Sequence, residues 1–168
     1  MNLVAKKNLV AKKPLELPVD GRQSETALAV ARGTARLLHA HGFSVVSELG
    51  LPSGRRADLV ALDAGGEIWI VEIKSSVADF RADQKWQDYR AHCDRLFFAT
   101  CMEVPCEIFP PDTGLIVADA FGAQMICEAP EHRLAAATRK SMMLSFARAA
   151  AQRLQSLADP TGPYGDVS

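Results

Sequence analysis

The sequence IWIVEIK, residues 68–74, is an apolar run that contains two charged residues. A continuous apolar run of this length is typical of a strand buried on both faces of a sheet. Glu72 and Lys74 interrupt the run, and an unpaired charge in such a strand costs several kcal/mol. Because side chains alternate along a strand, Glu72 and Lys74 share one face. The pattern therefore indicates a charged site built into a buried strand.

A second strand, ADLVAL at residues 57–62, precedes this one, and the four residues 63–66 separate the two. In the antiparallel hairpin that this spacing predicts, Asp58 lies beside Glu72. Two facing carboxylates repel each other unless a positive group lies between them. A divalent cation is the natural occupant, and hard oxygen ligands suit Mg²⁺ or Mn²⁺.

Two acids and a lysine around one metal ion are suited to phosphodiester hydrolysis. Lys74 would reach the same cavity, where an ammonium can orient the attacking water and stabilise negative charge on phosphorus. The alternative is that Asp58, Glu72 and Lys74 are ordinary residues at strand ends, either solvated or paired with each other. Glu-x-Lys is common by chance, so its combination with a buried strand and a facing aspartate is what favours a site.

The rest of the pattern predicts a mixed α/β domain with one sheet between helices. We expect a helix from Ser24, its cap, to about His41, and then a strand at 43–49. Beyond the charged strand, the sequence predicts a helix at 78–92, a strand at 95–100, a hairpin at 114–129 and a long final helix at about 131–157.

The formal net charge of −1 gives no support for nucleic-acid binding, which must come from a local patch or from bound metal. The candidate phosphate contacts are the basic residues nearest the motif, Arg55, Arg56, Arg81 and Lys85. Acidic residues are interleaved with them, so a solvated mixed surface is the competing interpretation. Any binding is expected to be weak and sensitive to salt.

The four cysteines, Cys93, Cys101, Cys106 and Cys127, include no CxxC pair. A cytoplasmic chain keeps its thiols reduced, so we expect core or surface thiols. An iron–sulfur or zinc site remains open, because the first three cysteines could converge if the chain between them folds back.

Asp58 together with Glu72-Ile73-Lys74 resembles the PD-(D/E)xK nuclease superfamily, whose restriction-endonuclease-like core is helix, three strands, helix, strand (αβββαβ). The resemblance implies that Asp58, Glu72 and the carbonyl of Ile73 bind metal, and that Lys74 completes the catalytic set. Glu25, on the first helix, matches the place where many members carry an extra acidic ligand. A solvated first-turn glutamate favoured by the helix dipole is equally consistent.

A closer resemblance is carried by RRADLVAL, EIWIVEIKSSVADFRADQKWQDYR and HCDRLFFAT, which are similar to the MmcB-type DNA repair proteins of bacteria. It implies a role in DNA repair or the damage response, with DNA and other repair proteins as partners. Together with the metal motif, the sequence predicts a magnesium-dependent nuclease that acts on DNA. The alternatives are a catalytically silent module that binds DNA structures, and an interaction scaffold in a repair complex. Ala57 stands where many superfamily members have proline. Gln84 and Tyr89 do not meet the Q-x-x-x-Y spacing of one nuclease branch, and Tyr89 could face the site or pack in the core.

The expected organisation is a basic, flexible arm at 1–20, a single nuclease-like α/β domain at 21–158 and a flexible tail at 159–168. The arm carries NLVAKK twice in tandem. No apolar run approaches the ~18 residues of a membrane span, and the N-terminus lacks the features of a secretory signal. The expected location is the cytoplasm.

Overall fold

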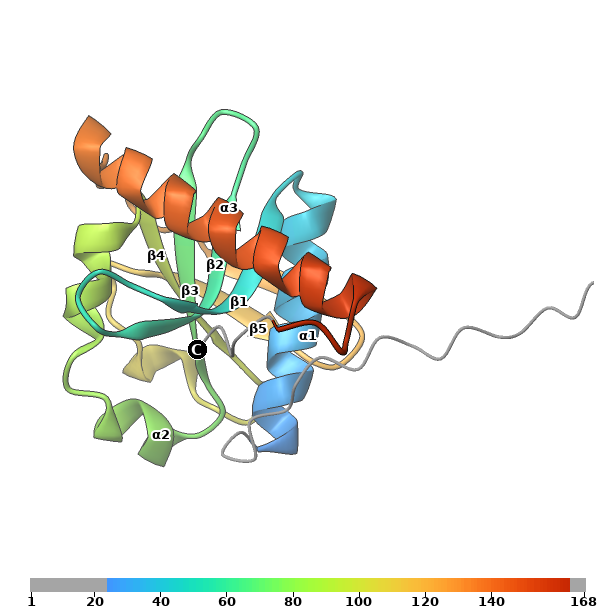
Figure 1. Ribbon diagram of the computed structural model, residues 1–168. Helices are drawn as coiled ribbons and strands as arrows, with labels where there is room; N and C mark the ends of the chain where they lie inside the picture. The colour runs from blue at the N-terminus through green and yellow to red at the C-terminus, as the bar shows by residue number, and fades with distance from the viewer. Residues whose placement is uncertain (1–23, 164–168) are drawn as a thin grey trace, which may run out of the picture.

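The computed structural model describes residues 24–163, which form one six-stranded mixed sheet with helices packed on it (Figure 1). The strands are β1 (Ser44–Gly50), β2 (Arg56–Leu62), β3 (Ile68–Lys74), β4 (Arg95–Thr100), β5 (Gly114–Ala118) and β6 (Ala123–Cys127). They lie in the order of the sequence. The β3–β4 and β4–β5 pairs are parallel and the other pairs are antiparallel.

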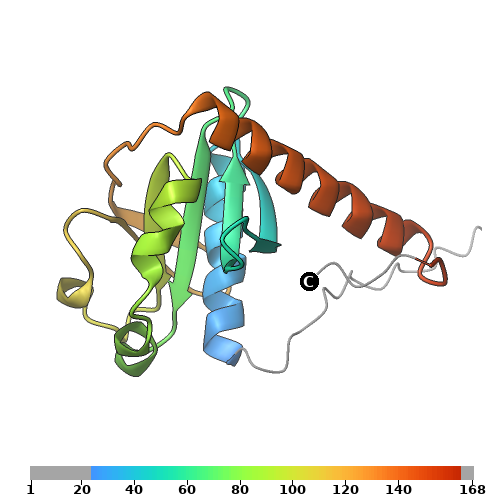
Figure 2. The ribbon, with the colours of Figure 1, turned by 60° about the vertical axis from the view of Figure 1, so that its left-hand side comes forward.

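The helices divide between the two faces of the sheet, as two views show (Figures 1 and 2). They are α1 (Glu25–Ala40), α2 (Val77–Ala82), α3 (Ala136–Ala158) and the 3-10 helices η1 (Trp86–His92) and η2 (Cys106–Ile108). One core, beneath α1, includes Val30, Leu38, Leu59, Val71 and Phe97. The other, beneath η1 and α3, includes Val60, Ile70, Tyr89, Met142 and Phe146. The order α1-β1-β2-β3-α2-β4 is the predicted αβββαβ core, and α3 is the predicted C-terminal helix.

The alternation along β3 decides which face carries the charged residues. Val71 belongs to the core under α1, whereas Ile68 and Ile70 belong to the core under η1 and α3. Glu72 and Lys74 continue the series of even-numbered positions, so they face the side of α2 and η1. They are 3% and 6% exposed, which confirms that the charges lie in a buried strand.

The single helix predicted at 78–92 is wrong, because the chain breaks between α2 and η1 at Asp83, Gln84 and Lys85. Asp83 ends α2 with an extended backbone, and its Oδ1 accepts a hydrogen bond from the backbone N–H of Lys85. Its Oδ2 accepts a hydrogen bond from Lys74 Nζ at 2.7 Å. These local bonds compete with continued helix, as the side chains of aspartates commonly do.

The final helix begins at Ala136 rather than near Glu131. The segment before it is tied to Asp94: the backbone N–H of Leu134 donates to Asp94 Oδ1, and that of His132 donates to the Asp94 carbonyl. Arg139, in the first turn of α3, donates to both oxygens of the same carboxylate. The helix therefore starts where Asp94 anchors it.

The expected arm at 1–20 and residues 164–168 of the expected tail lie outside the described residues. Among residues 24–163, none of the helices is both long and apolar enough to span a bilayer.

Candidate active site

The register of the β2–β3 hairpin brings Asp58 and Glu72 together, as predicted. Leu59 pairs with Val71 and Val60 with Ile70, so Asp58, one residue before this ladder, lies beside Glu72. The backbone N–H of Asp58 donates to Glu72 Oε1 at 3.3 Å. In the other direction, the backbone N–H of Ile73 donates to Asp58 Oδ2 at 2.7 Å. Each carboxylate is thus held by the backbone of the opposite strand.

Asp58, Glu72 and Lys74 line one cavity of about 480 Å³ at the end of the hairpin. The walls come from β2, β3, α2, η1 and the start of α1: Ser24, Ala27, Arg56, Asp58, Glu72, Ile73, Lys74, Ser75, Asp79, Asp83 and Tyr89. Several elements that are distant in sequence therefore present polar groups to the same space, which is the usual arrangement of a functional site.

Both acids resist ionisation in this cavity. Burial raises the pKa of Asp58 to about 6, against the hydrogen bond from Ile73 and the charge of Lys74, which lower it. Burial and the neighbouring charge of Asp58 raise the pKa of Glu72 to about 8. Perturbed carboxyl groups that share a cleft are characteristic of functional sites. A cation between the two carboxylates would relieve both effects.

Lys74 is held mainly by a residue that the sequence analysis missed. Its Nζ lies 2.7 Å from Asp83 Oδ2 and 3.8 Å from Glu72 Oε2. Burial disfavours the ammonium, but the hydrogen bond to Asp83 and the charge of Glu72 outweigh it and raise the pKa of Lys74. The lysine is therefore a fixed cation beside two acids. The only sequence signal for Asp83 was an acid placed nine residues after Lys74, which no strand or helix pattern singles out.

Asp79 and Tyr89 also face the cavity. Asp79, in the first turn of α2, accepts a hydrogen bond from the backbone N–H of Ser75 at 3.0 Å. Tyr89 is buried in the core under η1, and its hydroxyl donates to the Arg56 carbonyl at 3.2 Å. Burial and the charge of Glu72 raise its pKa, so it remains a neutral donor. Tyr89 therefore both faces the site and packs in the core, the two roles that the sequence left open.

The remaining predicted residues lie outside this arrangement or at its rim. Glu25 is exposed on the first turn of α1, where Ser24 and Ala27 line the cavity instead. Arg56 lines the cavity and forms an ion pair with Glu48, whereas Arg55 forms one with Asp88. Arg81 and Lys85 are exposed on α2 and at the break after it.

The cavity offers only a few metal ligands, but these suit an ion such as Mg²⁺. In residues 24–163 no group of three or more His, Cys, Asp or Glu side chains is placed to hold a metal ion. The four cysteines lie in this range and form no such group. Mg²⁺ requires only one or two carboxylates and takes its other ligands from carbonyls, water and substrate phosphate. Asp58, Glu72 and the Ile73 carbonyl are a donor set of that kind.

Comparison with solved structures finds a protein of unknown function from Silicibacter pomeroyi, with 48% identity and a TM-score of 0.80 over 83% of this chain and 96% of that one. A repair endonuclease from Pyrococcus abyssi is 18% identical, with a TM-score of 0.32 over 49% of this chain and 40% of that one, which is too limited to support an argument. No curated protein matches the chain. The family model described as "DNA repair protein MmcB-like" matches residues 14–161. The chain belongs to the MmcB-like family of DNA repair proteins.

Proposed function

We propose that the protein is a metal-dependent nuclease that hydrolyses phosphodiester bonds of DNA during repair. The observation that carries this proposal is the convergence of Asp58, Glu72 and Lys74 on one cavity, with the two acids facing each other across the β2–β3 hairpin. Membership of a family of DNA repair proteins supports DNA as the substrate.

In this proposal Asp58, Glu72 and the Ile73 carbonyl hold Mg²⁺ or Mn²⁺. The ion would act as a Lewis acid towards a phosphate oxygen and favour formation of the nucleophile from water. The chain's own residues supply the rest. The hydrogen bonds from Asp58 and Ile73 N–H groups fix the two carboxylates before any ligand arrives. The ammonium of Lys74, fixed by Asp83, faces the cavity as a cation that stabilises charge on the scissile phosphate.

The DNA would reach this cavity along a surface of mixed charge. Arg56 is the basic residue at the cavity wall, and Arg55, Arg81 and Lys85 are the neighbouring candidates for phosphate contacts. Phosphate contacts position the duplex without reading its sequence. Because Arg55 and Arg56 already pair with acids, we expect modest affinity that falls steeply with salt.

A second candidate, a DNA-structure-binding module without catalysis, is favoured by one feature. Lys74 is 2.7 Å from Asp83 but 3.8 Å from Glu72, so its closest partner is a residue outside the nuclease motif. A lysine retained by that ion pair would give a stable fold without assisting hydrolysis.

A cleavage screen separates these candidates. Labelled single-stranded, duplex, branched and damaged DNA, with RNA as a comparison, would be incubated with the full chain in Mg²⁺ or Mn²⁺, and in chelator. We expect cleavage only with metal, and its loss in Asp58→Asn, Glu72→Gln and Lys74→Met. Glu107→Gln, at an exposed acid of η2, is the matched control and should cleave normally.

Three results bear on the choice. Cleavage by purified Asp58→Asn at the wild-type rate would contradict the proposed site. Binding of DNA structures without cleavage under any metal would favour the silent module. Absence of both binding and cleavage would contradict both candidates.

A further inference from the structure

The outer face of α3 carries apolar side chains that residues 24–163 leave between 39% and 69% exposed. Four of the seven large hydrophobic residues exposed in this region are on α3: Met143, Leu144, Leu154 and Leu157, which are 39%, 55%, 69% and 40% exposed. The opposite face of the helix packs on the sheet through Met142, Phe146 and Ala149. Figure 2 shows α3 continuing past the sheet, so the outer face is accessible along the helix.

The spacing on this outer face is that of a helix–helix seam. Lys140, Leu144, Ala147, Ala151, Leu154 and Ala158 follow each other in alternating steps of four and three residues. This alternation keeps one stripe facing a partner helix. The two alanines at its centre allow close approach, and the leucines lie to either side of them. We define these six residues as the α3 seam.

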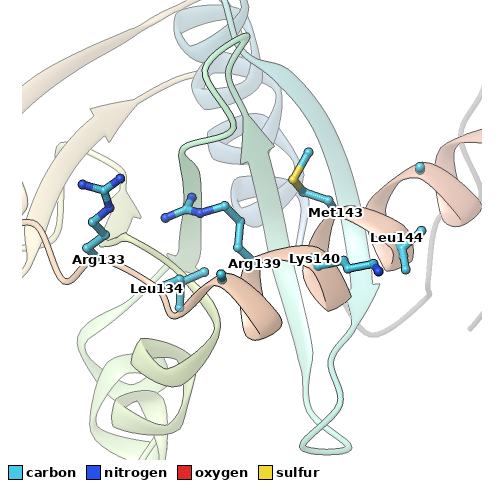
Figure 3. Close-up of a pocket in the computed structure, with 8 residues that line it drawn as sticks. Arg133, Leu134, Arg139, Lys140, Met143 and Leu144 are labelled. Atoms are coloured by element: carbon cyan, nitrogen blue, oxygen red, sulfur yellow. The ribbon is translucent and has the colours of Figure 1, made fainter.

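A groove of about 600 Å³ lies beside the N-terminal half of the seam (Figure 3). Its walls include Lys140, Met143, Leu144 and Ala147, with Arg133 at its edge. The C-terminal half of the same helix carries Leu154 and Leu157 as exposed knobs. The helix therefore offers a hollow at one end and protruding leucines at the other.

One acid at the C-terminal end of α3 can pair with a basic residue near its N-terminal end. Residues 132–158 contain five basic side chains and no Asp or Glu, and Asp159 follows directly at the C-terminal cap. Lys140 and Arg148 are exposed on the outer face. The C-terminal end of a helix is also negative through its last carbonyl groups, which favours a cation beside it.

We propose that α3 pairs with α3 of a second copy of this chain, antiparallel and related by a two-fold axis between Ala147 and Ala151. Leu144 then meets Leu154 of the second copy, and Met143 meets its Leu157. Lys140 lies beside Asp159 and the C-terminal carbonyls of the second copy. A two-fold interface requires one surface to complement itself, and this helix face does so through the apolar seam and through the contact of Lys140 with Asp159 at each end.

Other occupants fit this face less well. A DNA backbone would gain nothing from the leucines, and within α3 the exposed face offers only Lys140 and Arg148 as phosphate contacts. A single helix pair buries less than a standard interface of about 800 Å² per partner. The dimer is therefore expected to be weak and to form at micromolar or higher concentration.

Sedimentation of the full chain from about 1 µM to about 300 µM, the range in which so small an interface associates, tests this proposal. The mass should rise from one copy to two across the range. Leu144→Glu and Leu154→Glu should each weaken association at least tenfold. Phe121→Glu, at a side chain that is 84% exposed on the β5–β6 loop, is the matched control and should associate like the wild type.

Exchange of the terminal charges tests the antiparallel register separately. Lys140→Asp and Asp159→Lys should each weaken the dimer, and the double variant should regain most of it. Circular dichroism and thermal unfolding confirm that each variant is folded. A single-copy mass across the whole range overturns the proposal, and so does a dimer that the α3 variants leave unchanged.

Discussion

The backbone N–H of Asp58 donates a hydrogen bond to the carboxylate of Glu72, so the two acids are fixed side by side on neighbouring strands. A second hydrogen bond, from the Ile73 N–H to Asp58, fixes the other carboxylate. The arrangement opposes ionisation of both groups, because both are buried and the charge of Asp58 further raises the pKa of Glu72. In the absence of metal, the site should therefore lower the stability of the fold near neutral pH.

The first prediction concerns the pH dependence of the metal-free protein. The pKa of Glu72 is raised to about 8 and that of Asp58 to about 6 in the folded state. Between roughly pH 4 and pH 8 the folded state therefore binds more protons than the unfolded state, and the free energy of unfolding falls as the pH rises. Thermal and urea unfolding in chelator should show this decline.

The variant Glu72→Gln should flatten that decline and, at pH 8, leave the stability unchanged or raise it by roughly 1 kcal/mol. Mg²⁺ should stabilise the wild type at pH 8 and have no effect on Glu72→Gln. A loss of about 3–5 kcal/mol in metal-free Glu72→Gln would instead show that Glu72 serves as a structural partner of the buried Lys74.

The second prediction compares two ion pairs of similar length. Lys74–Asp83 is 2.7 Å long with side chains 8% and 19% exposed, whereas Arg55–Asp88 is 2.8 Å long with side chains 28% and 54% exposed. Asp83→Asn leaves a buried ammonium without its nearest carboxylate and should cost about 1–3 kcal/mol. Asp88→Asn should cost less than about 0.5 kcal/mol. Urea unfolding at pH 7 measures the free energy of unfolding of both variants. A loss for Asp83→Asn as small as that expected for Asp88→Asn would mean that Asp83 is dispensable for the fold.

The hairpin register could be predicted from the sequence because two strong local signals agree there. The apolar run of β3 and the short turn before it leave one pairing that buries both strands, and this pairing places Asp58 beside Glu72. The resemblance to a nuclease superfamily reached the same residues independently. The pairing of β2 with β3 and the pair of facing acids therefore follow from local sequence patterns.

Asp83 could not be predicted in the same way. Residues 78–92 have a periodicity that a single helix satisfies, and nothing local shows that the chain breaks at Asp83 to reach Lys74. The late start of α3 has a similar origin, because it depends on Asp94, which is 40 residues before Leu134. In both cases a distant partner overrides local propensity.

The third prediction tests whether Asp94 supports the fold without taking part in the candidate active site. The Asp94 side chain is 1% exposed and accepts hydrogen bonds from the N–H groups of Ile68 and Leu134 and from Arg139. Asp94→Ala leaves these donors without an acceptor and should lower the free energy of unfolding by about 3–5 kcal/mol. Asp112→Ala, at an acid whose side chain is 63% exposed, should cost less than about 1 kcal/mol.

If Asp94 is purely structural, the folded fraction of Asp94→Ala should still gain stability from Mg²⁺ whenever the wild type does. Metal titrations followed by thermal unfolding provide this readout. Loss of the Mg²⁺ effect in a folded Asp94→Ala protein would place Asp94 within the functional site.

The fourth prediction concerns the contact between α1 and the β5–β6 loop. A Cβ atom on Gly33 would lie 2.1 Å from the carbonyl oxygen of Asp119 and 2.4 Å from that of Gly122. Alanine normally favours a helix by about 1 kcal/mol over glycine, but here the backbone of the loop would have to move. Gly33→Ala should therefore lower the free energy of unfolding by about 1–3 kcal/mol. Gly50→Ala is the control, because a Cβ there meets nothing within 4 Å, and it should be neutral or stabilise by up to about 1 kcal/mol. Urea unfolding of both variants measures these changes. If Gly33→Ala proved as stable as Gly50→Ala, the β5–β6 loop could move without cost, and its close approach would not be the reason for glycine on α1.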